Sequence, residues 1–292
     1  MAAASRKRPA PDADGDSSAA ARGGSCKKKQ ALAVAAAYND YEFRSIRDYE
    51  LMEEIGKGSY GVVVKARDRR TGETIRDLAA DEATGQISLV MEFVGPSLRA
   101  CLRQRGRFSE AETRSFMRQL LSATKTMHGV KLIHRDMKPA NILIGGDDPG
   151  GANATLKICD FGAATARKPA GTPYPEPRVG TLFYRSPEQL QGDRCYGPGV
   201  DVWALGCVMV ELLTGEPLFG KADSEEEVLI MAAQLRDQVV SAGSEAFNGL
   251  PEPLSLAGRE VLRGLLRFDP EERFSAAEAL EHRWFAEDDD KT

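Results

Sequence analysis

Apolar residues divide this chain into a short part with strand patterns and a longer part with helix patterns. A glycine-rich turn over 56–61 lies between the segment 51–55, LMEEI, and the apolar run 62–64, which predicts a strand, a turn and a second strand. The short apolar run over 87–91 predicts another, buried strand. Helix patterns begin after Gly95, so we expect a small sheet-containing region before that residue and a larger helical region after it.

The longer part contains helices that can be placed by their caps and apolar faces. Residues 109–112 have the form of a capping box, and apolar residues at helical spacing follow them, which predicts a helix to about Met127. The run 202–213 is apolar nearly all round, as expected of a buried helix, and a last helix is predicted to begin at 276–280. Short strands are predicted on both sides of a polar loop, at 132–133, 142–144 and 156–159.

The two ends of the chain lack the residues that build a core. Residues 1–48 are rich in Ala, Gly, Ser and Asp, so we expect a disordered arm, and residues 287–292 form an acidic tail. The arm carries basic clusters at 6–8 and 27–29, which are either a nuclear-import signal or a solvated run of charge. We therefore expect the protein in the nucleus, the cytoplasm or both.

Composition argues against several classes of function. The 292 residues carry a net charge of −5, which argues against general nucleic-acid binding. The longest apolar run is too short to cross a bilayer, and the N-terminal sequence has no apolar core typical of a signal peptide. The five cysteines have no paired spacing, which indicates free thiols in a reducing compartment rather than disulfides or a zinc site.

Two motifs carry the chemistry. The segment 134–141, HRDMKPAN, combines an acid, a lysine and an amide, and the segment 160–162, DFG, adds a second acid before a glycine. Such a set suits phosphoryl transfer, in which a protein mostly positions groups and neutralises charge. A single acid beside a turn is more often a cap or a turn former. The order and spacing of the whole set, however, resemble those of the eukaryotic protein kinases.

The resemblance implies a role for each polar residue of these motifs. Asp136 would accept or orient the hydroxyl proton of a protein substrate, and Lys138 would neutralise charge on the transferred phosphoryl group. Asn141 and Asp160 would hold Mg²⁺ through oxygen ligands, which this hard cation prefers. Lys138 in this motif also implies serine or threonine as the phosphate acceptor.

The glycine-rich turn would cover the phosphates of ATP in such an enzyme, because glycines let backbone N–H groups approach phosphate closely. By itself this pattern is weak, since a glycine-rich hairpin is often only a turn. The residues implied to hold ATP are Ile55, Gly56, Gly58, Gly61 and Val63 at this turn and, through backbone groups at a hinge, Glu92 and Val94.

The resemblance extends over residues 49–286 and is strongest to the cyclin-dependent kinases, in particular the F-type group of plants. Residues 181–188, TLFYRSPE, resemble the peptide-docking segment, so Gly180, Thr181 and Arg185 are implied to dock the substrate. This segment should select a proline after the target residue, and Gly180 permits a positive φ there without steric cost.

Two structural contacts are implied as well. The resemblance implies an ion pair between Glu188 and Arg273, and a brace for the catalytic loop at Asp201. The alternative for both is an ordinary surface charge. If the pair is buried, breaking it costs about 3–5 kcal/mol, so it would matter for stability.

Four residues match positions that regulate such kinases. Ser59 and Tyr60 match glycine-loop residues that are phosphorylated in the family, where phosphate would add about −1.5 to −2 charge beside the ATP phosphates. Glu176 stands five residues before Thr181, where the activation loop is usually phosphorylated. We hypothesise that Glu176 pairs with Arg135 and partly mimics a phosphate. The alternative is a solvated glutamate.

A segment that such kinases need is missing from the pattern. An active member has a lysine on its third strand that contacts ATP phosphates and a glutamate on the next helix that holds this lysine. The stretch 67–85 is too short for a strand–helix–strand unit, which takes roughly 30 residues or more. Relatives dock cyclins on that helix, so docking of a cyclin is doubtful. Lys65 could substitute for the lysine, although a lysine at a strand end is usually solvated.

The sequence therefore predicts an α+β, two-lobed protein kinase fold, with a reduced antiparallel sheet in an N-lobe over 49–94 and a helical C-lobe over 95–286. The favoured function is ATP- and Mg²⁺-dependent phosphorylation of serine or threonine in a protein substrate, with no membrane or nucleic-acid partner and with a regulatory protein left open. The alternatives are a catalytically impaired pseudokinase or binding scaffold, and a mis-joined transcript of a normal kinase with its join near 74–75.

Overall fold

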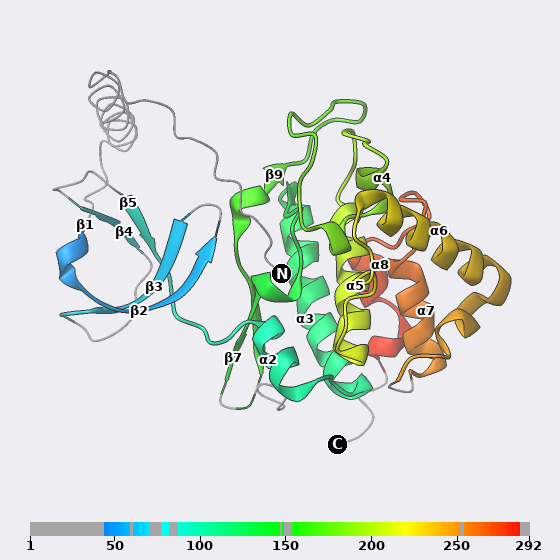
Figure 1. The fold of residues 1–292 in the computed structure, drawn as a ribbon, viewed down its shortest axis with the longest axis horizontal. Coiled ribbons are helices and arrows are strands. Elements are labelled where there is room, and N and C mark those ends of the chain that lie inside the picture. Colours follow the sequence, from blue (N-terminus) through cyan, green and yellow to red (C-terminus); the bar gives the residue numbers. More distant parts are fainter. Residues whose placement is uncertain are drawn as a thin grey trace, which may run out of the picture. The chain divides into compact units, whose positions relative to one another are not determined.

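The computed structural model describes residues 44–58, 61–70, 77–81, 87–146, 148, 154–251 and 254–286, and the chain divides into two compact units, Met1–Phe93 and Val94–Thr292 (Figure 1). Most of the predicted arm with its basic clusters, the two glycine-loop residues Ser59 and Tyr60, and the acidic tail 287–292 lie outside the described residues. No described helix combines the length and the apolar character that crossing a bilayer requires.

The first unit contains two small sheets. Its strands are, in chain order, β1 (Arg44–Ser45), which the 3₁₀ helix η1 (Ile46–Asp48) follows, β2 (Tyr49–Gly58), β3 (Gly61–Asp68), β4 (Asp77–Ala80) and β5 (Ile87–Val90). β2 and β3 form an antiparallel hairpin around the glycine-rich turn, and β4 and β5 form a second antiparallel hairpin. β1 adds to the second sheet as a parallel neighbour of β4.

These two sheets correct one detail of the sequence interpretation. A single reduced antiparallel sheet was expected, but within the described residues the β2–β3 hairpin shares no ladder with the β1–β4–β5 sheet, and β1 pairs with β4 in parallel. The physical reason lies in the length of the chain between β3 and β4, because only residues 69–76 separate Asp68 from Asp77. Among the described residues, the strand edges that an additional strand would cover therefore have no ladder partner.

The second unit is mainly helical. Its described helices are, in chain order, α2 (Leu98–Arg105), α3 (Glu110–Gly129), α4 (Pro187–Leu190), α5 (Gly199–Thr214), α6 (Glu225–Ala242), α7 (Leu256–Leu265) and α8 (Ala276–Leu280). Its short strands form antiparallel pairs, β6 (Leu132–Ile133) with β9 (Thr165–Ala166) and β7 (Ile142–Gly145) with β8 (Thr155–Ile158). Single 3₁₀ turns are η2 (Pro139–Asn141), η3 (Phe161–Ala163), η4 (Leu182–Tyr184), η5 (Gly243–Phe247) and η6 (Arg283–Phe285).

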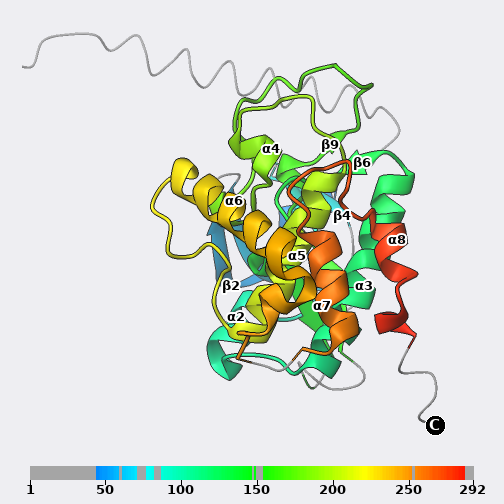
Figure 2. The ribbon, with the colours of Figure 1, turned by 90° about the vertical axis from the view of Figure 1, so that its right-hand side faces the viewer.

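The core of this unit forms around α5, which is buried along almost its whole length. α5 packs against α3 on one side and α7 on another, and the two views in Figures 1 and 2 agree on this arrangement. The predicted buried helix over 202–213 is confirmed and extends by a few residues at its N-terminal end. The predicted capping box at Ser109 is also present, and α3 runs from Glu110 to Gly129 with Phe116 and Leu120 buried.

Four described helices, α2, α4, α6 and α7, were not placed by the sequence interpretation. α6 and α7 both begin after a serine N-cap, Ser224 and Ser255, whose side chains accept a hydrogen bond from the third helical backbone N–H. Three glutamates, at 225–227, fill the first turn of α6, as the helix dipole favours. These local start signals were present in the sequence, but α6 buries only a narrow stripe of residues, so its apolar periodicity is weak.

The ion pair expected between Glu188 and Arg273 is present and buried. The two guanidinium nitrogens of Arg273 donate to the two carboxylate oxygens of Glu188 at 2.8 and 3.0 Å. Arg273 also donates to the backbone carbonyl of Gly199 at 3.0 Å. This bidentate pair ties α4 to the beginning of α5 and to the chain before α8.

A second acid, the partly buried Glu110, joins three separate segments of the unit. Its carboxylate accepts from the backbone N–H and the hydroxyl of Ser255 and from the indole N–H of Trp284. Burial alone would raise the pKa of Glu110. The donors on Ser255 and Trp284 and the cation of Arg114 outweigh it and hold this pKa below its usual value. The start of α3 is thereby linked to the cap of α7 and to η6.

This linkage predicts how stability depends on pH. The pKa of Glu110 is lower in the folded state than in the unfolded state. Its contribution to the free energy of unfolding is therefore fully present at pH values above the unfolded-state pKa of about 4.3, and it is lost as the pH falls through the folded-state pKa. We expect Glu110→Gln to lower the free energy of unfolding at pH 7 by about 1.5–3 kcal/mol, because a charged acceptor is lost. Urea unfolding at pH 7 and at about pH 3–5 measures both the loss and its pH dependence.

The matched control is Glu226→Gln, which changes an exposed glutamate in the first turn of α6. A surface change of this kind should stay within about 0.5 kcal/mol. If both variants lost the same stability at pH 7, or if Glu110→Gln kept the full acid sensitivity of the unmodified chain, Glu110 would not be the link described.

Candidate active site

The catalytic loop is fixed by a buried carboxylate on α5. Asp201 lies in the first turn of α5 and is fully buried. It accepts hydrogen bonds from the backbone N–H groups of His134 at 2.9 Å and Arg135 at 2.8 Å, and it contacts the ring Nε2 of His128 at 2.9 Å. The expected brace at Asp201 is therefore present. It holds Arg135 at a φ of 67°, a left-handed conformation that is uncommon for a residue with a side chain.

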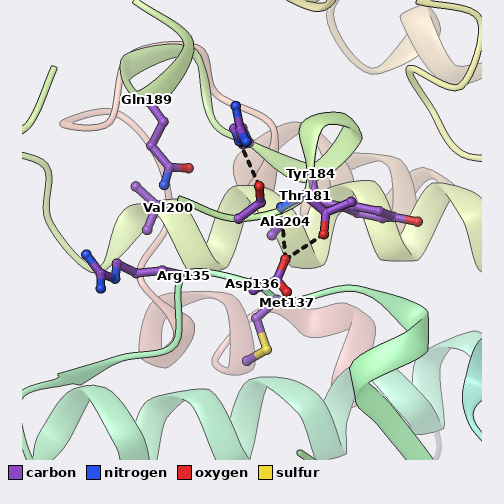
Figure 3. Close-up of a pocket in the computed structure, with 10 residues that line it drawn as sticks. Arg135, Asp136, Met137, Thr181, Tyr184, Gln189, Val200 and Ala204 are labelled. Carbon is purple, nitrogen blue, oxygen red and sulfur yellow. Dashed lines mark hydrogen bonds between the residues drawn. The ribbon is translucent and has the colours of Figure 1, made fainter. Parts of the chain in front are cut away.

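Asp136 is the point on which the polar residues of the loop converge. One carboxylate oxygen accepts from the backbone N–H of Thr181 at 2.9 Å and from its hydroxyl at 2.7 Å (Figure 3). The other accepts from the ammonium of Lys138 at 2.7 Å and from the amide of Asn141 at 3.1 Å. These four donors match the number of lone-pair sites on a carboxylate, so the orientation of Asp136 is fully determined.

Asn141 and Asp160 are brought together by the β7–β8 pair. Ile142 faces Ile158 in the register, and the backbone N–H of Cys159 donates to the carbonyl of Asn141 at 2.9 Å. The Asn141 amide nitrogen donates to Asp136, which leaves the amide oxygen for a cation, and Asp160 is exposed with a φ of 60°. An amide oxygen and a carboxylate are ligands that suit Mg²⁺, so the residues present fit this ion.

No group of three or more His, Cys, Asp and Glu side chains that could hold a metal occurs in the described part of the chain. Asn141 and Asp160 would therefore supply part of a coordination shell. Mg²⁺ is commonly bound in this way, with one or two protein ligands and with water and substrate phosphates completing the shell.

The cysteine before Asp160 is not a reactive group. Burial, and next the neighbouring charge of Asp160, raise the pKa of the Cys159 thiol to about 11. The thiol is therefore protonated near neutral pH, and thiolate chemistry at this position is not expected.

Arg135 and Glu176 form the contact that the sequence analysis hypothesised. A guanidinium nitrogen of Arg135 donates to Glu176 at 3.0 Å, and the side chains are 4% and 48% exposed. Burial opposes the charge of Arg135, but hydrogen bonds to Tyr196 and Glu176 outweigh it and raise its pKa. The hydrogen bond from Arg135 in turn lowers the pKa of Glu176. Glu176 is thus a paired anion rather than only a solvated one.

The predicted docking residues line one pocket next to Asp136. The pocket is bounded by Asp136, Gly180, Thr181 and Arg185, together with apolar groups on η4 and α5 (Figure 3). Gly180 has a φ of 85°, and its carbonyl accepts from Arg185 Nε at 2.9 Å. Arg185 is itself held by Glu225, the first residue of α6. Thr181 is therefore shared between the pocket and the hydrogen bonds to Asp136.

The residues predicted to hold ATP lie in the first unit, except Val94, which is the first residue of the second unit. In the β2–β3 hairpin Gly56 faces Val63 and Gly58 faces Gly61 across the glycine-rich turn, with Ile55 just before it on β2. Glu92 and Val94 lie in the irregular stretch after β5, the first in one unit and the second in the other.

Lys65, the candidate substitute for the missing lysine, has partners inside the first unit. Its ammonium lies 3.5 Å from the carboxylate of Glu53 and 4.7 Å from the ring centroid of Phe93. The side chain is 31% exposed, so it is neither buried nor fully solvated. The structure thus places Lys65 in a strand-to-strand ion pair on the β2–β3 hairpin.

Sequence reasoning missed three residues that contact the catalytic loop or the acid that braces it. His128 reaches Asp201 from the end of α3, and Tyr174 and Tyr196 stack beside Arg135. An acid such as Asp201 in an otherwise apolar buried helix signals that a polar partner must exist. Similarly, a tyrosine among prolines and glycines, such as Tyr174, indicates that its ring packs against the protein and holds the loop in place.

Comparison with known proteins identifies the family. The family model for the protein kinase domain matches residues 74–285. A protein of Oryza sativa subsp. japonica, provisionally named cyclin-dependent kinase F-2, is 35% identical over 82% of this chain and 90% of its own length. Cyclin-dependent kinase G-2 of Oryza sativa subsp. indica is 31% identical over 84% of this chain and 42% of its own length. Cell division control protein 2 homolog 3 of Trypanosoma brucei brucei is 32% identical over 82% of this chain and 92% of its own length.

The alignments also bear on the missing segment. The alignment with the F-2 protein runs over 306 positions, more than the 292 residues of this whole chain, yet it covers only 82% of the chain. The relative therefore has residues with no counterpart here. The family match begins at Thr74, next to the junction that the sequence singled out. The match over 74–285 and the F-2 relative show that this chain belongs to the protein kinase family, among its cyclin-dependent-kinase-like members.

Proposed function

We propose that this chain is a proline-directed serine/threonine kinase that transfers the γ-phosphate of ATP to a protein hydroxyl, at a rate reduced by its shortened first unit. The observation that carries this proposal is the convergence of Lys138, Asn141 and Thr181 on Asp136. A structural acid would need no such set, whereas phosphoryl transfer requires an acid, a cation and metal ligands in one place.

The hydrogen bonds of Asp136 suggest how a substrate hydroxyl enters. All four lone-pair sites of the carboxylate are taken, so a hydroxyl must displace one donor. Lys138 is the donor suited to leave, because its ammonium also contacts the hydroxyl of Thr181 at 2.7 Å and sits on a flexible stem. When Lys138 turns to a phosphoryl oxygen, Asp136 gains the free lone pair that accepts the hydroxyl proton.

The metal would be held beside this acid. Asn141 and Asp160 supply the amide and carboxylate oxygens, and Mg²⁺ bound there would neutralise charge on the ATP phosphates. The amide nitrogen of Asn141 donates to both the carbonyl and the carboxylate of Asp136. This contact would keep the metal ligand and the acid in a fixed relation during transfer.

Proline selection follows from the backbone at Gly180. Its carbonyl is occupied by Arg185, so it offers no acceptor to the backbone N–H of the residue after the target. Proline lacks that N–H and loses nothing in such a pocket, whereas other residues leave an unpaired donor. The pocket beside Thr181 is lined on one side by apolar groups such as Val200 and Ala204, which suits a proline ring (Figure 3).

The rate should be low because one phosphate-contacting group is missing. Loss of a single charge-stabilising group in such a site costs about 10² to 10³ in rate. The relatives named as cyclin-dependent kinases suggest a regulatory protein partner for this chain as well. The helix on which cyclins dock has no room in the stretch between β3 and β4, so we do not propose a cyclin at that position.

A second candidate is a binding scaffold without turnover. The observation that favours it is the first unit, where the β2–β3 hairpin and the β1–β4–β5 sheet share no ladder among the described residues. In that case the docking pocket beside Thr181 would hold a proline-containing segment of a partner protein without phosphorylating it.

The first test is the catalytic acid. We expect purified chain to transfer labelled phosphate from Mg-ATP to peptides containing Ser-Pro or Thr-Pro, and Asp136→Asn to lower the initial rate by about 10² to 10⁴, because the proton acceptor is lost. Asp237→Asn, which changes an exposed acid on α6, is the matched control and should retain the rate. Equal signals from the unmodified chain and Asp136→Asn would instead favour the scaffold.

The second test is the backbone at Gly180. A Cβ there would lie 2.4 Å from the carbonyl oxygen of Arg135, and the φ of 85° is left-handed. We expect Gly180→Ala to lower the free energy of unfolding by more than the ~1–2 kcal/mol that a left-handed alanine costs alone. Gly171→Ala is the control, because it has a φ of 75° in the same segment but open space around its Cβ. The same loss in urea unfolding for both variants would show that the contact with Arg135 is unimportant.

A further inference from the structure

The activation segment is the chain between the DFG motif at 160–162 and the docking segment at 181–188. Its tyrosine is fully buried inside an otherwise exposed stretch. Residues 171–173 and 175–178 are exposed, whereas Tyr174 between them is 1% exposed. Burying an aromatic side chain removes about 150–250 Å² from water, which is a large stabilising contribution for a short loop. A short loop can bury a tyrosine only where other residues surround its ring. The residues around the Tyr174 ring therefore show which parts of the structure this tyrosine connects.

The ring of Tyr174 belongs to a small second core at the base of the catalytic loop. The cluster consists of Ile133, Tyr174, Tyr196 and Val200. Ile133 directly precedes the catalytic loop and Val200 directly precedes Asp201. Tyr174 and Tyr196 stack with ring centroids 4.8 Å apart and an angle of 29° between the rings. The activation segment is thus packed onto the residues that fix the loop.

The same ring covers the buried cation of Arg135. The guanidinium carbon lies 5.4 Å from the Tyr174 ring centroid, and one guanidinium nitrogen donates to the Tyr196 hydroxyl at 3.3 Å and to Glu176 at 3.0 Å. A half-exposed carboxylate is a weak partner for a buried guanidinium, since solvent screens it. A desolvated cation over an aromatic face is attracted more strongly than an exposed one.

The backbone of Tyr174 is clamped as well. Its N–H donates to the carbonyl of Arg194 at 2.8 Å, and Arg194 Nε donates back to the carbonyl of Tyr174 at 2.7 Å. The tyrosine hydroxyl accepts from the backbone N–H of Lys168 at 3.2 Å. Tyr174 is therefore held at its ring face, its hydroxyl and both backbone groups. It is also the one buried residue of the stretch 171–178.

We propose that Tyr174 is a positioning residue that holds the activation segment on Arg135 without a phosphate group. It acts through Arg135 and Glu176 on the docking residues Gly180 and Thr181, so this inference rests on the proposed function. The aromatic face of Tyr174 adds to the stabilisation of the Arg135 guanidinium, which the single charge of Glu176 provides only in part. The segment would then be set for substrate in the unphosphorylated chain.

The experiment compares Tyr174→Leu, which keeps apolar bulk but has no aromatic face, with Tyr174→Phe, which keeps the face. Full-length protein made in bacteria and shown by mass spectrometry to carry no phosphate is digested with trypsin under native conditions. Cleavage is followed after Arg178, whose side chain is 75% exposed. We expect Tyr174→Leu to speed this cleavage roughly 5- to 30-fold, as the loss of a desolvated cation–π contact implies, and Tyr174→Phe to stay within about twofold.

Glu176→Gln supplies the comparison at the same cation, Arg135, because it removes the charge of Glu176 and leaves the ring of Tyr174. We expect it to speed cleavage less than Tyr174→Leu does. In the kinase assay Tyr174→Leu should raise the KM for the acceptor peptide and leave the KM for ATP unchanged, and Tyr174→Phe should restore the peptide KM. A purely structural role would move both constants or neither.

Several outcomes would overturn the proposal. They are wild-type cleavage in a folded Tyr174→Leu, equally fast cleavage in Tyr174→Phe, or a larger effect from Glu176→Gln. If Tyr174→Leu does not fold, hydrogen exchange on the unmodified chain decides, because the amide of Tyr174 should be protected by its bond to Arg194. Exchange at the rate of an open loop would refute the anchor. Proteolysis and exchange need no turnover, so a chain no more active than Asp136→Asn would defeat the proposed function and leave this test intact.

Discussion

The rest of the site depends on one fully buried carboxylate, that of Asp201 at the start of α5. A buried charge is tolerated only when donors surround it, and here the donors are the backbone N–H groups of His134 and Arg135. Because the helix core fixes α5, this requirement fixes the catalytic loop. The loop then takes the left-handed turn at Arg135 that sends its side chain toward the activation segment and presents Asp136 to Thr181.

The second unit assembles the parts of a transfer site within itself. Asp136, Lys138, Asn141 and Thr181 are joined by direct hydrogen bonds, and the β7–β8 pair adds Asp160. The carboxylate of Glu176 and the rings of Tyr174 and Tyr196 around Arg135 support the activation segment. Within its described residues the first unit has two sheets in place of one, and the chain between β3 and β4 is short. The chain therefore brings together, in the second unit, the residues that the family resemblance implies for phosphate transfer, while the first unit, which carries the glycine-rich turn, is shortened.

The sequence predicted much of this architecture, because motif residues carry their own chemistry. The convergence on Asp136 could be expected from the residue types and order of the two motifs, whereas the brace at Asp201 and the pair of Glu188 with Arg273 were implied by the resemblance to protein kinases. The contacts of Tyr174 could not, since they depend on a tertiary pocket built from Ile133, Tyr196 and Val200, which are separated in sequence. α6 was missed because its narrow buried stripe gives little apolar periodicity in the sequence. The split sheet was missed because the sequence of a single strand does not determine which other strand it pairs with.

We propose that the transfer residues are competent and that the shortened first unit limits their rate. The most direct measurement is the rate of phosphate transfer by a chimera in which a third strand carrying a lysine and the following helix carrying a glutamate, taken from an active cyclin-dependent kinase, are inserted between Thr74 and Ile75. If the account is right, the chimera should transfer phosphate faster than this chain by about 10² to 10³, the worth of one charge-stabilising group. A folded chimera with no increase would show that the site around Asp136 is itself inactive, and would contradict the account.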